Sequence, residues 1–155
     1  MLQGQHMKEF SVAVSLKDEL LRSGNVMFTN KGVSMRPLLR EGRDIMIIEK
    51  RTPDTALSPG MAVLFERSSG DLVLHRIYRK KGNGFLILGD NCINPEYVED
   101  ERIIGILTGV VRDGKKTVNV TDKSYQRYVK LWTASYPVRR LILKAKNKFL
   151  NRERQ

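Results

Sequence analysis

The sequence predicts a mainly β fold: a compact, coiled antiparallel β domain with a helix before it and basic helices after it. Short segments rich in β-branched residues recur through the middle of the chain, and several of them alternate apolar with polar side chains. Turn residues separate these segments at regular intervals, a pattern typical of antiparallel β structure. A chain of 155 residues is long enough to form one domain with a buried core.

The first predicted element is a helix from Ser15 to Gly24. Ser15, with Asp18 three positions later, resembles a capping box, and Gly24 is a typical helix stop. One apolar face is formed by Leu16, Leu20 and Leu21. We therefore expect this helix to pack over an edge of the sheet.

The β structure is predicted to begin at Val26 and to be divided by several turn segments. These are Ser58-Pro59-Gly60, Ser69-Gly70-Asp71, Gly82-Asn83-Gly84 and Asp113-Gly114. Glycine and aspartate in such turns permit the backbone conformations that tight hairpins need. The predicted strands are Asp44–Glu49, Met61–Glu66, Leu72–Arg79, Phe85–Leu88, Ile103–Arg112 and Lys116–Val120.

Two helical segments, Ser124–Tyr136 and Val138–Arg152, are predicted after the strands. Pro137 divides them and suits the first turn of the second helix. The apolar face of the second segment comprises Val138, Leu141, Ile142, Ala145 and Phe149. Most of its remaining surface is basic, through Arg139, Arg140, Lys144, Lys146 and Lys148. This pattern predicts an amphipathic helix.

The net charge of +11 lies mostly at the C-terminal end of the chain. Residues 123–155 hold ten Lys and Arg against one acidic residue, whereas the residues before them carry a charge of only +2. We therefore divide the chain into a β domain at residues 7–122 and a basic helical extension at residues 123–155. Residues 1–6, which end in His-Met, are compatible with an expression remnant before a natural start at Met7.

Three interpretations of the basic extension stay open. It is a solvated helix packed through its apolar face, or an amphipathic helix lying on an anionic membrane, or a nucleic-acid contact. Trp132, Tyr136 and Phe149 beside basic residues favour the membrane over nucleic acid. Nucleic acid ranks last because positive charge alone does not identify it as a partner.

The composition excludes several classes of protein. No run approaches the ~18 consecutive apolar residues of a membrane span, and the N-terminus lacks the layout of a secretory signal. The single Cys92 excludes an internal disulfide, and we expect it to be a small buried residue. Two histidines and one cysteine without a close ligand cluster predict no metal and no cofactor. We expect a cytoplasmic protein, either free or peripheral to a membrane.

One serine lies in a glycine-containing turn whose residues suit a ligand site. Residues 32–37 read Gly-Val-Ser-Met-Arg-Pro. Gly32 lets a ligand approach the backbone closely, and Pro37 makes the turn rigid just past Ser34. Ser34 is therefore the candidate nucleophile, and the candidate substrate-binding residues are Gly32, Met35 and Pro37. By itself, this pattern also fits an ordinary surface turn.

A histidine on a predicted strand could supply the base that Ser34 needs, since a serine hydroxyl is a poor nucleophile until a base takes its proton. Strand alternation places His75 on the same inward face as Val73 and Ile77. Imidazole titrates near neutral pH, which suits a general base. An inward histidine on its own also fits a satisfied core residue.

The turn Gly89-Asp90-Asn91 offers a third group. A carboxylate bonded to the far imidazole nitrogen would hold the tautomer and stabilise the imidazolium, so Asp90 is the predicted third member. Glu99 and Asp100 are alternatives for this role. The backbone N–H of Ser34 is the expected donor to an oxyanion.

Taken in order, the segments around Ser34, His75 and Asp90 resemble three motifs of the signal peptidase I family, in the wider group that includes the self-cleaving LexA-type repressors. The resemblance covers about Phe28 to Arg112. It implies a Ser34 nucleophile and, because the base position holds His75, the His-type branch. Family members usually carry a transmembrane anchor, which this sequence does not predict. They also often continue the third motif with Ser and Asp, whereas residues 93–96 here read Ile-Asn-Pro-Glu, so the third group stays open.

These features predict a serine endopeptidase that cuts an extended peptide or leader segment after a small residue, using Ser34 and His75. One alternative is a catalytically inactive β module that binds peptides or membrane surfaces. The other is a fragment of a repressor-type autoprotease, although only 33 residues precede Ser34 and no Ala-Gly bond occurs for self-cleavage. No proposed site residue lies in residues 138–155, so we expect a chain without this segment to keep its cleavage activity.

Overall fold

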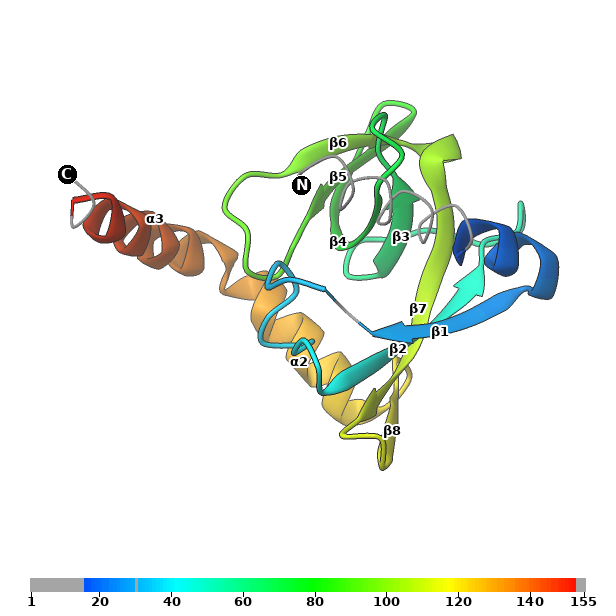
Figure 1. Ribbon diagram of the computed structural model, residues 1–155. Helices are drawn as coiled ribbons and strands as arrows, with labels where there is room; N and C mark the ends of the chain where they lie inside the picture. The colour runs from blue at the N-terminus through cyan, green and yellow to red at the C-terminus, as the bar shows by residue number, and fades with distance from the viewer. Residues whose placement is uncertain (1–15, 30, 153–155) are drawn as a thin grey trace, which may run out of the picture.

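The computed structural model describes residues 16–29 and 31–152, so the predicted helix start at Ser15 and residues 1–6 lie outside the described part of the chain. A helix over residues 16–23 precedes a mainly antiparallel sheet, and two helices follow the sheet (Figure 1). The predicted fold class is confirmed.

The sheet contains eight strands in the order β1-β2-β7-β3-β4-β5-β6, with β8 paired to β7. Every pairing is antiparallel, and the tight turns predicted after β3, β4 and β7 each join two such neighbours. The strands are β1 Asn25–Thr29, β2 Asp44–Lys50, β3 Ala62–Glu66, β4 Leu72–Lys81, β5 Gly84–Leu88, β6 Glu96–Glu99, β7 Ile103–Arg112 and β8 Lys116–Asn119.

The structure differs from the prediction at two places. Strand β6 was not predicted, because four residues with charged ends give no alternation that stands out from a loop. The C-terminal helices are α2, Lys123–Ala134, and α3, Tyr136–Arg152, so the break falls at Ser135 and Pro137 lies in the first turn of α3. A short 3-10 helix, η1, spans Asp100–Arg102 between β6 and β7.

Two apolar clusters fill the fold. The larger one extends from the helix at residues 16–23 to α2, which contributes Tyr125 and, less deeply, Tyr128 and Val129. The smaller one lies on the half of the sheet that runs from β7 to the edge strand β6, and it comprises Val63, Phe65, Ile77, Phe85, Ile87, Val98 and Ile103. Because α2 helps to close the larger cluster, this part of the basic extension is packed into the body of the protein.

Helix α3 continues from α2 and projects away from the β body, so that its C-terminal turns extend beyond the sheet (Figure 1). Within residues 16–29 and 31–152, no helix combines the length and apolar character that a membrane crossing requires.

Candidate active site

Ser34 lies half-buried in the turn between β1 and β2. Buried side chains directly after it anchor the turn in the larger apolar cluster, namely Met35, Leu38 and Leu39. Arg112 of β7 donates a hydrogen bond to the carbonyl oxygen of Leu38 and so fastens the end of the turn to the sheet. Gly32 has a φ of 82°, a backbone conformation that favours glycine. The turn that carries Ser34 is therefore fixed to the core and to the sheet by the residues that follow it.

His75 lies on β4 opposite Val63 of β3, and only 6% of its surface is exposed. Its ring contacts the edge of Phe65, with ring centroids 6.0 Å apart. This is the inward position that strand alternation predicted from Val73 and Ile77. The packing fixes the ring in one place, which a positioned base requires.

The loop at residues 89–91 brings Ser34 and His75 to the same place. The backbone N–H of Asn91 donates to the carbonyl oxygen of Ser34 at 2.7 Å. A Cβ atom at Gly89 would lie 2.7 Å from that same oxygen and 3.0 Å from Nε2 of His75. The Ser34 backbone and Nε2 of His75, together with Sγ of Cys92, therefore all lie against Gly89, too close for a side chain at this position.

The other ring nitrogen of His75 faces a carboxylate that the sequence did not point to. Nδ1 of His75 lies 3.1 Å from Oε1 of Glu96, at the start of β6. Arg67 holds the same carboxylate in a fork, with Nη2 at 2.7 Å from Oε1 and Nε at 3.1 Å from Oε2. Because a carboxylate only accepts, Nδ1 carries the proton and Nε2 is left as the acceptor towards Gly89 and Ser34.

The electrostatics of this group favour a neutral imidazole beside an ionised carboxylate. Burial lowers the pKa of His75 below its ordinary value of 6.5, and the negative charge of Glu96 offsets only part of this effect. Burial alone would raise the pKa of Glu96, but the hydrogen bonds and charge of Arg67 more than compensate and lower it. At neutral pH His75 is therefore unprotonated and able to accept a proton.

Asp90 occupies a different position from the predicted one. It is buried and accepts from Arg76, with Nε to Oδ1 and Nη2 to Oδ2 both at 2.8 Å, while the hydroxyl of Tyr128 donates to Oδ2 at 2.7 Å. Arg76 follows His75 directly on β4, so its side chain points to the opposite face of the strand. The Asp90 carboxylate thus pairs with Arg76 instead of His75.

The two alternatives considered for the third group are also engaged elsewhere. Glu99 pairs with Arg102, and Asp100 pairs with Arg51. Of the carboxylates in the described chain, the one bonded to His75 is that of Glu96.

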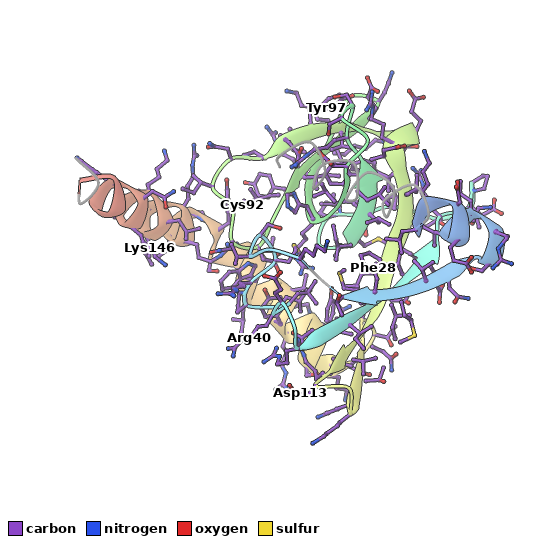
Figure 2. All side chains as sticks on the ribbon, viewed as in Figure 1. Phe28, Arg40, Cys92, Tyr97, Asp113 and Lys146 are labelled. Atoms are coloured by element: carbon purple, nitrogen blue, oxygen red, sulfur yellow. The ribbon has the colours of Figure 1, made fainter. Side chains whose placement is uncertain are left out.

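The predicted substrate-binding residues differ in their exposure. Gly32 and Pro37 are exposed beside Ser34, whereas Met35 is fully buried as a core anchor and has no surface for a ligand in this structure. A hollow of about 360 Å³ adjoins the Glu96–Arg67 pair instead. Its walls are formed by Phe65, Glu66, Arg67, Ser68, Ser69, Glu96, Tyr97, Val98, Glu99 and Arg102. Figure 2 shows Tyr97 on β6, at the edge of the sheet.

The C-terminal helices contact the loop that carries Asp90. Trp132 donates from Nε1 to the carbonyl oxygen of Asp90 at 3.0 Å, and Arg139 donates from Nη1 to the same oxygen at 2.7 Å. Tyr136 donates its hydroxyl proton to the carbonyl oxygen of Ile93 at 2.8 Å. The end of α2 and the first turn of α3 therefore hold the loop in place through hydrogen bonds.

Cys92 lies on the loop between β5 and β6 (Figure 2). It is half-buried, and burial raises the pKa of its thiol, so it stays a thiol at neutral pH. Within the described residues, no three His, Cys, Asp or Glu side chains gather in a way that could hold a metal ion. Comparison with family models and with curated proteins gives no match to this chain.

Proposed function

We propose that this protein is a serine endopeptidase in which Ser34 is the nucleophile and His75 is the general base. One observation carries the proposal: the Ser34 backbone and Nε2 of His75 both lie against Gly89, while Nδ1 of His75 is held by Glu96. A nucleophile, a base and a group that orients the base form the arrangement that acyl transfer requires. Glu96 takes the place that Asp90 had in the sequence-based prediction.

In the proposed reaction, Nε2 of His75 takes the hydroxyl proton of Ser34 while Oγ attacks the carbonyl carbon of the scissile peptide bond. The oxyanion that forms accepts from the backbone N–H of Ser34. The imidazolium, stabilised by Glu96, then gives its proton to the leaving amine, and an acyl-enzyme remains on Ser34. Water, deprotonated by His75, hydrolyses this ester, releases the carboxylic acid product and restores the serine hydroxyl.

The resemblance to signal peptidases implies an extended peptide segment, cut after a small residue, as the substrate. Gly32 and Pro37 are exposed and close to Ser34 in the chain, so they are suited to contact the peptide backbone.

Cleavage of a mixed peptide library, followed by mass spectrometry, tests the proposal directly. We expect peptides to be cut at neutral pH, and His75→Ala to lower the rate about 10³-fold or more, as when a triad base is removed. The rate should rise with pH through the pKa of His75, below 6.5, and then level off, since only the neutral ring accepts the serine proton. A library left intact by the wild-type protein would favour the alternative of a peptide-binding β module without catalysis.

Two substitutions around His75 are expected to shift this pH profile in opposite directions. Glu96→Gln removes a charge that raises the pKa of His75, so the acidic limb should move to lower pH. Arg67→Gln removes a charge that lowers it, so the limb should move to higher pH. Glu96→Gln should also reduce kcat by at least about 10-fold, because the amide no longer selects the His75 tautomer with the proton on Nδ1. For comparison, replacing the buried aspartate of a Ser-His-Asp triad by asparagine lowers kcat about 10⁴-fold.

Arg102→Gln is the matched control, because Arg102 lines the same hollow but pairs with Glu99. It should leave the acidic limb where it is in the wild type. If Glu96→Gln lowers activity without moving the limb, Glu96 has a structural role only and does not position His75.

A further inference from the structure

Helix α3 carries an exposed apolar stripe that continues from α2. The exposed fractions are 72% for Leu131, 60% for Val138, 70% for Leu141 and 60% for Ile142. These residues are among the most exposed large apolar side chains in the described chain. A contiguous apolar surface of this kind marks an interaction site more often than isolated exposed residues do.

The stripe faces away from the β body. On a helix with 3.6 residues per turn, Tyr136, Arg139 and Leu143 share one side, which is less exposed than the stripe, and Tyr136 and Arg139 on this side bond to the loop at residues 90–93. Val138, Leu141 and Ile142 fall on the other side of the helix. The interpretation that the apolar face packs on the β domain is therefore wrong for the described residues.

The charge around the stripe is positive throughout. No acidic residue occurs between Lys123 and Arg152. Lys148 borders the stripe on one side and Lys146 on the other, and both are exposed. Figure 2 shows the side chains of α3, including Lys146, extending into open space. Apolar residues flanked by lysines are typical of helices that lie in a lipid interface, with the lysine heads at the phosphates.

We propose that α3 docks on an anionic membrane surface, with Leu141 and Ile142 entering the headgroup region and the lysines contacting acidic lipids. The combination of charge and apolar stripe favours this partner over nucleic acid, which would not need the stripe. Trp132 and Tyr136 do not take part, because both are engaged with the Asp90 loop. This inference concerns localisation and does not depend on the proposed peptidase activity.

Sedimentation of the full chain with lipid vesicles tests the charge contribution. We expect binding to phosphatidylcholine vesicles that contain phosphatidylglycerol at low salt, weak binding to pure phosphatidylcholine, and release near 1 M salt, where the Debye length is about 3 Å. The triple substitution Lys144→Gln, Lys146→Gln and Lys148→Gln should weaken binding about 100-fold. The control triple Lys80→Gln, Lys81→Gln and Lys115→Gln removes equal charge from the β body and should change binding only a few-fold.

The apolar contribution is tested by the double substitution Leu141→Gln and Ile142→Gln, with Met27→Gln as an exposed apolar control on β1. The double variant should bind anionic vesicles at least about 10-fold more weakly, with a nearly unchanged melting temperature, because Leu141 and Ile142 are mostly exposed in the free protein. Absence of binding to anionic vesicles at low salt would overturn the proposal. Undiminished binding of the double variant to anionic vesicles would also overturn it. That result would show that the helix binds through charge alone, as it would bind a polyanion such as nucleic acid. A lipid-free dimer that this variant abolishes would identify a second copy as the partner and would equally overturn it.

Discussion

Replacing Ser34 with alanine is expected to abolish peptide cleavage while leaving the melting temperature almost unchanged. The turn is held by the buried Met35, Leu38 and Leu39 and by the bond from Asn91 to the carbonyl oxygen of Ser34, and none of these contacts uses the hydroxyl group. Removing the hydroxyl therefore removes the nucleophile and little else, and surface changes of this kind usually alter stability by less than about 0.5 kcal/mol. Initial rates on a cleaved peptide and a thermal melt measure both effects.

Ser68→Ala provides the matched control, since Ser68 is an exposed serine on the wall of the hollow. It should retain cleavage, with at most a change in KM. Cleavage by Ser34→Ala at the wild-type rate would end the serine-peptidase proposal, because no acyl-enzyme could form at this position.

Replacing Asp90 with alanine is expected to destabilise the fold by about 3–5 kcal/mol, the usual result of removing one partner from a buried ion pair. Burial alone would lower the pKa of Arg76, but its hydrogen bonds and charge contact with Asp90 raise it, so Arg76 stays charged in the core. Without the carboxylate, this charge loses its two direct bonds and Tyr128 loses its acceptor. Denaturant unfolding of the variant measures the loss.

Two comparisons isolate the ion pair. Glu99→Ala breaks the exposed Glu99–Arg102 pair and should cost below about 1 kcal/mol. The double variant Asp90→Leu with Arg76→Met should recover much of the lost stability, because it removes both charges together. If Asp90→Ala unfolds at the wild-type denaturant concentration, the ion pair does not hold the loop to β4.

The strands could be predicted because their signals are local. Alternating side chains and turn residues such as Gly70 and Gly114 determine where a strand starts and ends, and both glycines adopt positive φ in the structure. Strand β6 has no such signal. Its place is determined by pairing with β5, where Glu96 lies opposite Ile87, itself opposite Ile77.

The same pairing explains why the sequence did not indicate that Glu96, and not Asp90, faces His75. Glu96 and His75 are 21 residues apart in sequence, and they come close only because β4, β5 and β6 lie side by side in the sheet. The Asp90 motif, in contrast, is easy to recognise, but recognition does not show which of two adjacent residues on β4 it faces. His75 and Arg76 point to opposite faces, and Asp90 lies on the side of Arg76.

The loop at Asp90 is fastened from several directions before any substrate arrives. Arg76 and Tyr128 hold its side chain, Trp132 and Arg139 hold its carbonyl oxygen, and Asn91 joins it to Ser34. The conformational entropy of ordering this loop is therefore lost when the chain folds. In the proposed peptidase, binding energy from a peptide would not be diverted to assembling the site and would remain for lowering the barrier of the reaction.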